Sequence, residues 1–347
     1  MNVLSRAERK LDHIRHALTH ERDYYNHFDD VEIVHQSIAH LNFDELHVSA
    51  TVGELQISSP LFVNAMTGGG GKETLKINEA IAEAAAHTGI GMAVGSQMAA
   101  IKDPSERPSY EIVRKRNPRG TVFANVGSEA SLHQAQSAVD MLEADALQIH
   151  VNTLQELIMP EGDRDFTSRL QNMEQIVQGI HVPIIVKEVG YGMSKATIQT
   201  LADIGVSYID VGGRGGTNFS MIENMRREKP FSSFNNWGIP TPVSLLEAAD
   251  IRKERDVHII GSGGIRHGLD GAKAMALGAS AFGMAGGLLK VLVNHGMDEL
   301  IAEIDHIHYE LKIAMMLTNS KNLEELRETS VVVYGKTREW IEQRAKL

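Results

Sequence analysis

Eight short apolar segments recur along the chain, and each is followed by Gly, Asn or Ser and then by a helical pattern. The segments are continuously apolar, as expected of parallel strands that helices cover from outside. They span residues 60–65, 91–94, 121–126, 146–151, 183–189, 208–211, 257–260 and 281–284. Eight β-then-α units predict an α/β fold, a (β/α)8 TIM barrel with an N-terminal extension. A doubly wound open sheet is the alternative, but it rarely has this many units without a second domain.

The segments between the predicted strands carry helix boundary signals. Residues 72–89 have an apolar face and stop at Gly89. Residues 194–205 begin at Ser194, a favourable N-cap, and stop at Gly205, a favourable residue just after a helix. A third helix is expected within 268–279, between the last two strands.

Two regions fall outside this repeat. Residues 1–58 form the extension, with a helix predicted over 5–18 and a small hairpin within 41–58, and residues 59–347 form the barrel. The connection between the sixth and seventh strands contains residues 227–242, with two Phe, one Trp and three Pro. That composition favours an ordered flap over a linker.

Composition excludes several classes of function. The 347 residues include 34 Lys and Arg against 45 Asp and Glu, a net charge of −11, which argues against a general nucleic-acid binder. The chain has no Cys, so disulfides, thiolate zinc sites, iron–sulfur clusters and cysteine nucleophiles are excluded. It has no apolar run long enough to span a membrane, and its N-terminus is charged, so we expect a cytoplasmic protein.

Glycine-rich loops follow the last two predicted strands. "GSGGIRHG" (261–268) comes after the seventh strand and "GMAGGLL" (283–289) after the eighth. Glycine lets backbone N–H groups approach an anion closely, and the helix that follows favours negative charge at its start. Phosphate sites in barrels commonly form from these two loops, so we predict one here rather than two tight turns alone.

The other predicted strand ends carry small and polar residues that would ring the mouth of the barrel. They are Asn64, Thr67, Ser96, Asn125, Lys187 and Thr217. A flat heteroaromatic cofactor could lie over such a ring, with amides and hydroxyls bonding its carbonyls and nitrogens. A lysine within "PIIVKEVG" would otherwise be buried without a partner, which is costly, so we expect Lys187 to be functional. A lysine can stabilise negative charge near a flavin N1.

The fourth predicted strand ends in a dense polar cluster. "ALQIHVNTLQELIMPEGDRDF" (146–166) brings His150, Asn152, Gln155 and Glu156 within seven positions. In a barrel this is the face where catalysis occurs. Glu156 alone could be an exposed acid at a helix start. His13, His16 and His20 have helical spacing, but a scattered helix surface is the simpler interpretation than a metal cluster.

Six motifs taken together resemble a known family. They are "AMTGG" (65–69), "GSQ" (95–97), "QIHVNTLQE" (148–156), "VKEVG" (186–190), "VGGRGGTN" (211–218) and "GSGGIRHGLDGAKAMALGA" (261–279). With "SRAERKLDHI" near the N-terminus, they resemble type 2 isopentenyl-diphosphate isomerase, a family of FMN-dependent (β/α)₈ barrels. The resemblance covers essentially the whole chain.

The resemblance implies interconversion of isopentenyl and dimethylallyl diphosphate by 1,3-proton transfer, with reduced FMN and Mg²⁺ and without net redox turnover. It implies NADPH as reductant, a small-molecule diphosphate substrate and a homotetramer or homo-octamer. FMN contacts are implied at Ala65, Met66, Thr67, Ser96, Asn125, Lys187 and Thr217, and contacts to its phosphate at Gly263, Gly264, Ile265, Ala285 and Gly286, with Arg266 adding charge.

The resemblance also assigns residues to substrate and metal. Glu156 is the implied Mg²⁺ ligand. Gln155 and His150 are the implied catalytic residues. Substrate contacts are implied at Arg9, Lys10, Asn152, Gln155 and Ser96, with His13 near the diphosphate. One departure is Met98, since "GSQ" is often followed by arginine in the family, and this puts one phosphate contact in doubt.

Three other functions are consistent with parts of the pattern. A flavin oxidoreductase such as a hydroxy-acid oxidase would need a histidine base, for which His150 and His267 are candidates, and an arginine for the carboxylate. An inosine-monophosphate dehydrogenase has similar loops but needs a cysteine nucleophile, which this chain lacks. A non-catalytic binding scaffold would not need the phosphate loops, Lys187 and Glu156.

Overall fold

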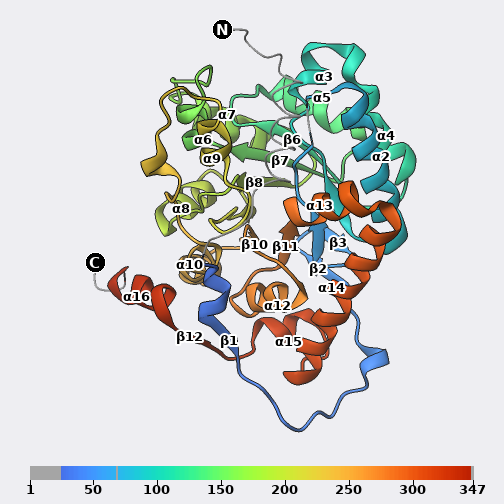
Figure 1. The fold of residues 1–347 in the computed structure, drawn as a ribbon, viewed down its shortest axis with the longest axis vertical. Helices are drawn as coiled ribbons and strands as arrows, with labels where there is room; N and C mark the ends of the chain where they lie inside the picture. The colour runs from blue at the N-terminus through green and yellow to red at the C-terminus, as the bar shows by residue number, and fades with distance from the viewer. Residues whose placement is uncertain (1–24, 68, 345–347) are drawn as a thin grey trace.

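The computed structural model describes residues 25–67 and 69–344. Eight parallel strands close into a barrel in chain order, which confirms the predicted fold (Figure 1). They are β4 (Leu61–Val63), β5 (Gly91–Ala93), β6 (Val122–Gly127), β7 (Ala146–Val151), β8 (Ile184–Glu188), β9 (Tyr208–Asp210), β10 (His258–Ser262) and β11 (Ala281–Met284). β11 pairs with β4, which closes the ring and leaves no free sheet edge.

Helices surround the barrel, and two of the predicted boundaries can be checked residue by residue. α2 ends before Gly89, which adopts the left-handed conformation (φ 76°). The Ser194 hydroxyl accepts from the Thr197 backbone N–H and caps the helix that follows. The helices are α2 (Gly71–Thr88), α3 (Met98–Lys102), α4 (Pro108–Arg116), α5 (Leu132–Leu142), α6 (Thr153–Ile158), α7 (Arg169–Gly179), α8 (Lys195–Asp203), α9 (Phe219–Asn224), α10 (Thr241–Glu247), α11 (Ala249–Glu254), α12 (Gly268–Ala276), α13 (Gly286–His295), α14 (Met297–Leu317), α15 (Leu323–Arg327) and α16 (Gly335–Arg344).

A hairpin closes the amino-terminal end of the barrel. β2 (Ala50–Val52) pairs antiparallel with β3 (Leu55–Ile57), which confirms the hairpin predicted within 41–58. The Tyr208 hydroxyl donates to the Val52 carbonyl (3.1 Å) and accepts from the Glu54 N–H (2.7 Å). Gly53 is required at the turn because its φ is +55° and a Cβ there would lie 2.2 Å from the Tyr208 hydroxyl.

The two ends of the described chain are joined. β1 (Val31–Ile33) pairs antiparallel with β12 (Val331–Val333), so blue and red segments run side by side in Figure 1. The buried Asp30 carboxylate accepts from the backbone N–H (2.9 Å) and hydroxyl (2.7 Å) of Thr337. The division at residue 58 stays a prediction, and the helix predicted over 5–18 lies outside the described residues.

The connection predicted to be an ordered flap contains a short 3₁₀ turn, Ser232–Phe234. Two side-chain amides hold this turn: Asn218 donates to the Asn235 backbone carbonyl (2.6 Å), and Asn224 donates to the Asn235 side-chain oxygen (2.7 Å). Its aromatic residues Phe231, Phe234 and Trp237 are nevertheless exposed, so amide hydrogen bonds rather than aromatic burial order this loop.

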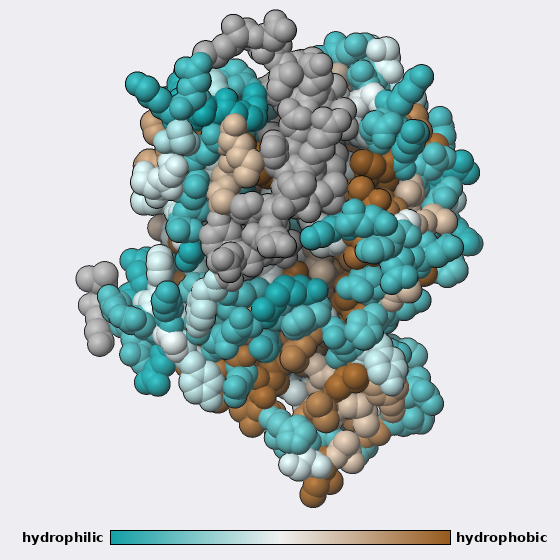
Figure 2. Space-filling model, viewed as in Figure 1, coloured by the Kyte–Doolittle hydropathy of each residue, from teal (hydrophilic) through white to brown (hydrophobic). Residues whose placement is uncertain are grey.

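In the described residues, no helix combines the length and the apolar character needed to cross a membrane. Apolar side chains do gather on one part of the surface, at the lower end of the view in Figure 2. The exposed residues of this region include Val34, Ile38, Leu317 and Val332. The segments that carry them lie side by side, because Val34 and Gln36 donate their backbone N–H groups to the Ser330 and Leu317 carbonyls and Asn319 donates to the Ile38 carbonyl.

Candidate active site

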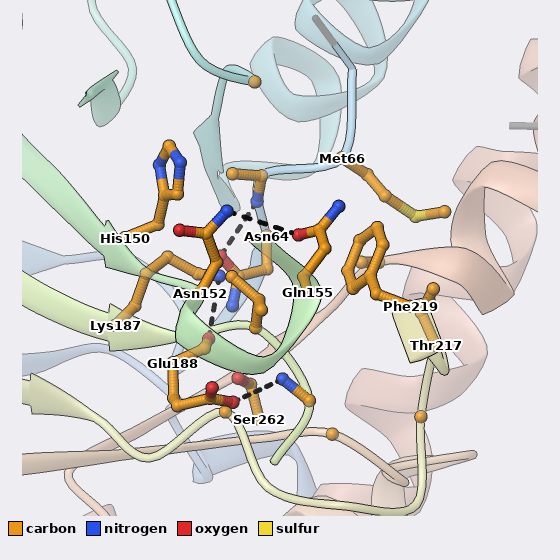
Figure 3. A pocket seen from close by; sticks show the side chains of 18 of the residues that line it. Asn64, Met66, His150, Asn152, Gln155, Lys187, Glu188, Thr217, Phe219 and Ser262 are labelled. Atoms are coloured by element: carbon orange, nitrogen blue, oxygen red, sulfur yellow. Dashed lines mark hydrogen bonds between the residues drawn. The ribbon is translucent and has the colours of Figure 1, made fainter. Parts of the chain in front are cut away.

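A cavity of about 600 Å³ opens at the carboxyl ends of the barrel strands. Its lining includes residues that follow all eight strands, so the barrel as a whole positions it (Figure 3). The predicted site residues that line it are Ala65, Met66, Ser96, Asn125, His150, Asn152, Gln155, Glu156, Lys187, Thr217, Gly263, Gly264, Ile265, Ala285 and Gly286.

The structure does not bring every predicted residue to this cavity. The Thr67 hydroxyl donates to Asn78 of α2, so its side chain is directed into the helix layer. Arg266 is paired with Asp270 (2.7 Å) and Asp29 (2.6 Å) and does not line the cavity. Arg9, Lys10 and His13 lie outside the described residues. His267 also does not line the cavity, and its Nδ1 accepts from the Asp270 N–H as the cap of α12.

A chain of buried amides crosses the floor of the cavity. Asn125 donates to Gln148 (3.2 Å), Gln148 donates to Asn64 (3.2 Å), and Asn64 donates to Asp210 (2.7 Å). The Ser262 hydroxyl donates to the other oxygen of Asp210 (2.5 Å). These side chains come from four strands and, for Asn64, from the residue that follows β4, and each is satisfied by its neighbour, which is the condition for burying polar groups at acceptable cost.

Lys187 is the buried cation of this floor. Its Nζ donates to the Glu188 carbonyl (3.0 Å), and it pairs in register with Asp210 across β8 and β9. Burial lowers the pKa of Lys187 and raises that of Asp210, and their mutual attraction opposes both shifts.

The Gln155 carboxamide is held from two sides. Its Nε2 donates to Glu223 Oε1 (3.2 Å) and its Oε1 accepts from Asn152 Nδ2 (3.5 Å). The same Asn152 nitrogen donates to Glu156 (2.9 Å), whose other carboxylate oxygen accepts from the Asp163 N–H (2.9 Å). The start of α6 therefore fixes the orientation of two predicted substrate and metal residues.

Glu223 was not found from the sequence. It lies in α9, is fully buried, and forms an ion pair with Arg226 (2.5 Å), which also pairs with Glu161 (2.5 Å). Glu and Arg three residues apart are typical of a solvated helix face, so the spacing gave no signal of burial. Phe219, at the start of the same helix, lines the cavity beside Gln155 and was also missed (Figure 3).

The His150 ring is oriented by Asn125. Its Nδ1 lies 2.8 Å from Asn125 Oδ1, and an amide oxygen only accepts, so Nδ1 carries the proton. A neutral imidazole fixed in this way presents Nε2 as an acceptor. Figure 3 shows His150 and Gln155 on opposite sides of Asn152.

Glu188 is a second acid that the sequence did not distinguish from its neighbours. It lines the cavity, and its carboxylate accepts from the backbone N–H groups of Gly190 (2.6 Å) and Tyr191. Burial raises the pKa of Glu188 to about 7, against the opposing effects of these N–H groups and of Lys187.

The two glycine-rich loops meet at one side of the cavity because β10 and β11 are neighbours. Gly263 and Gly264 have φ values of +93° and +81°, and a Cβ at Gly263 would lie 2.0 Å from the Gly213 carbonyl oxygen. The Gly264 carbonyl accepts from Asn26 (2.7 Å), so the loop is held on its outer side. Its inner side and the start of α13 face the cavity, as a phosphate site requires.

Two buried polar atoms at the cavity have no hydrogen-bond partner among the residues that the structure describes. They are the Ser96 hydroxyl oxygen and the side-chain oxygen of Asn152. Buried polar atoms are nearly always satisfied, so these two atoms indicate a polar ligand. In the described part of the chain, no group of three or more His, Asp or Glu side chains is placed to hold a metal ion. Glu156 would therefore hold a cation only together with ligands from elsewhere.

The chain is similar to curated proteins over nearly its full length. A family model described as FMN-dependent dehydrogenase matches residues 110–333. Proteins named isopentenyl-diphosphate delta-isomerase are 52% identical in Geobacillus sp. (strain WCH70), over 98% of this chain and 97% of that protein, and 52% identical in Bacillus licheniformis with the same coverage. One from Bacillus cereus (strain AH187) is 53% identical, also over 98% and 97%.

Solved structures share the fold at much lower identity. A mandelate oxidase with (S)-mandelic acid superposes with a TM-score of 0.64 at 15% identity, covering 96% of this chain and all of that one. A mandelate oxidase with a monooxide FMN adduct gives a TM-score of 0.61 at 15% identity, covering 94% and 92%. At this identity the likeness concerns the barrel alone.

Proposed function

The chain belongs to the type 2, FMN-dependent isopentenyl-diphosphate delta-isomerase family and is an isomerase, and from this premise we propose that it interconverts isopentenyl and dimethylallyl diphosphate by 1,3-proton transfer. In this proposal reduced FMN and Mg²⁺ are bound and the flavin is not turned over as a redox centre. The substrate is a small molecule, with its alkene over the floor of the cavity and its diphosphate at the rim.

One observation carries the choice between isomerase and hydroxy-acid oxidase. Among the described residues, no arginine lines the cavity, although an oxidase would need one to bind a substrate carboxylate. The position above β7 is instead occupied by the Gln155 carboxamide, which Glu223 and Asn152 hold in place. A neutral, oriented amide suits an uncharged hydrocarbon chain with a remote diphosphate better than it suits a carboxylate.

FMN fits the residues present. Gly263, Gly264 and Ile265 of one loop and Ala285 and Gly286 of the next would hold its phosphate, because the glycines let it approach the backbone closely. Asn125, Ser96 and Thr217 would bond the polar edges of the ring, and the unpartnered Ser96 hydroxyl supports this. Lys187 would supply a buried positive charge that favours negative charge on the flavin.

The described residues supply only part of a coordination shell for Mg²⁺, as expected if the substrate supplies further ligands. Mg²⁺ keeps several waters and commonly takes one or two carboxylates plus phosphate oxygens. Glu156 would supply the carboxylate, and Asn152 and the Asp163 N–H already hold it in one orientation. The cation would therefore bind together with the diphosphate rather than before it.

The reaction needs a proton added at one carbon and removed at another. Reduced FMN, when bound, supplies the acid and base for this transfer. The chain itself orients the reactant: Gln155 is fixed by Glu223, and His150 is fixed as the Nδ1–H tautomer by Asn125. Such positioning lowers the activation barrier, because the entropy cost of orienting the substrate is already met when it binds. The aromatic ring of Phe219 helps exclude water on the same side.

The reductant and the assembly state belong to the same proposal. NADPH would reduce the flavin before turnover, as the family resemblance implies. A homotetramer or homo-octamer would bury exposed apolar residues, and the region around Val34, Ile38, Leu317 and Val332 supports such an interface.

An anaerobic exchange experiment tests the proposed reaction. The purified protein would be reduced and given isopentenyl diphosphate with Mg²⁺ in D₂O. We expect deuterium-labelled dimethylallyl diphosphate with no net oxidation of the flavin. Absence of exchange, together with bleaching of the oxidised flavin by a hydroxy acid, would support the oxidoreductase instead. A colourless protein that takes up no FMN would support the non-catalytic scaffold.

A further inference from the structure

The charges that line the cavity do not suit a diphosphate without help. Within residues 25–67 and 69–344, the carboxylates of the lining are Glu129, Glu156, Glu161, Asp163 and Glu188. The cationic side chains of the same lining are Lys102 and Lys187. A diphosphate carries several negative charges, so it would meet a lining with an excess of acids.

Lys187 cannot serve the diphosphate from its place in the barrel. It is buried in the floor, donates to the Glu188 carbonyl, and pairs in register with Asp210. Lys102 is therefore the cation of the described lining that stands at the rim.

Lys102 is placed and available for this role. It is the last residue of α3, the helix that follows β5, and its side chain is exposed. Its ammonium makes no hydrogen bond or ion pair with another described residue, although four carboxylates share the rim. Position 98, one turn earlier in the same helix, holds a Met that is buried in the apolar core and offers no charge.

The strand order puts Lys102 beside the proposed cation site and away from the proposed FMN phosphate. β5, β6 and β7 are neighbours in the barrel, so Lys102 and Glu156 border the same side of the mouth. Ser96, with its unpartnered hydroxyl, belongs to the same β5–α3 connection as Lys102. The glycine loops after β10 and β11 form a different part of the rim.

We propose that the Lys102 ammonium binds the diphosphate group of the substrate, on the same side of the mouth as the cation held by Glu156. The inference rests on the proposed function and adds a residue to it. A lysine has three donors on a flexible stem and can follow a diphosphate between its positions, and charge-assisted bonds to phosphate are among the stronger hydrogen bonds. Lys102 thus affects binding of the charged group more than the proton transfer at the alkene.

The test uses the FMN-loaded full-length enzyme with K102M, K102R and a control, K115M. Lys115 is an exposed lysine of α4 that does not line the cavity, so the control removes the same charge elsewhere. Inorganic pyrophosphate binding would be measured by calorimetry with Mg²⁺ present, and KM and kcat with isopentenyl diphosphate. Retention of the flavin spectrum would establish that each variant folds.

For K102M we expect pyrophosphate affinity to fall and KM to rise by about tenfold, with kcat changed by less than about threefold. K102R should retain most of the affinity, and K115M should match the wild type. The inference is wrong if K102M binds pyrophosphate as the wild type does, or if K102R loses as much affinity as K102M. A wild-type enzyme that binds pyrophosphate but does not isomerise the substrate would contradict the proposed function and leave the Lys102 result interpretable.

Discussion

The barrel interior has two layers that come from the same strands but differ in chemistry. The lower layer contains Phe62, Phe123, Ile185, Tyr208 and Ile260, packed against the β2–β3 hairpin. The upper layer lies two residues further along each of these strands. Its members are Asn64, Asn125, Lys187, Asp210 and Ser262.

This two-residue step explains why one barrel can be both a core and a site. Side chains two apart on a strand point to the same side, so both layers face the interior. The lower layer stabilises the fold through apolar burial at roughly 25 cal/mol per Å². The upper layer is equally buried but polar, and its hydrogen bonds offset much of the desolvation cost without adding comparable stability. The difference separates residues that hold the barrel from residues that act in it.

The largest effect should come from removing the main aromatic contact of the lower layer. Phe62 packs edge to face on Phe123 at 5.5 Å and is almost fully buried. We expect F62A to lower the free energy of unfolding by about 3–5 kcal/mol, because the cavity cannot collapse in a closed barrel. Urea denaturation would measure it. F234A, at an exposed aromatic of the flap, is the matched control and should change stability little.

In the upper layer, removal of the cation should lower activity more than it lowers stability. K187M replaces the buried ammonium with an apolar side chain of similar length. We expect kcat to fall about 10²–10³-fold, since a preorganised charge is lost, and the free energy of unfolding to fall by less than in F62A, because Asp210 loses an attracting charge but keeps its hydrogen bonds from Asn64 and Ser262. Steady-state kinetics and urea denaturation of the same sample would separate the two effects. Equal losses of stability and activity would remove the distinction between the layers.

A pH series on Glu188 sharpens the electrostatic side of the comparison. Burial raises its pKa to about 7 in the folded protein. Between the ordinary pKa of a glutamate and about pH 7, the folded state therefore keeps a proton that the unfolded state has already released. Stability should therefore fall as pH rises from about 5 to about 8, by on the order of 2–3 kcal/mol. E188Q cannot titrate and should show a flatter profile in urea denaturation. A wild-type stability that rises over this range would contradict the sign.

The smallest effect should follow from changing one orienting bond at the rim of the upper layer. E223Q keeps the shape of Glu223 but weakens its hold on the Gln155 amide. We expect kcat to fall by about two- to tenfold, with KM for the substrate nearly unchanged. E161Q is a matched control. Glu161 is the other carboxylate paired with Arg226, and in the described part of the chain no hydrogen bond links it to Gln155, so its substitution should have a weaker effect. A KM increase without a kcat change would show that Glu223 acts on binding instead.

Much of the site was predictable because a barrel collects the ends of its strands. Once eight β/α units were recognised, His150 to Glu156, Lys187 and the two glycine loops had to face one mouth, and the structure places them there. Glu223 and Phe219 were not predictable in this way. They lie in α9, and only the packing of that helix over α6 turns them toward Gln155.

The amino-acid sequence by itself determined the order and type of the barrel elements, because continuous apolar runs and glycine caps act locally. It also determined which residues would stand at strand ends. Tertiary structure decided that Gln148, Asp210 and Ser262 join Asn64 and Asn125 in one buried hydrogen-bonded network, because those bonds link side chains that are distant along the chain. It also decided that Thr67 and Arg266 turn away from the cavity while Lys102 stands at its rim, because each depends on contacts with distant segments.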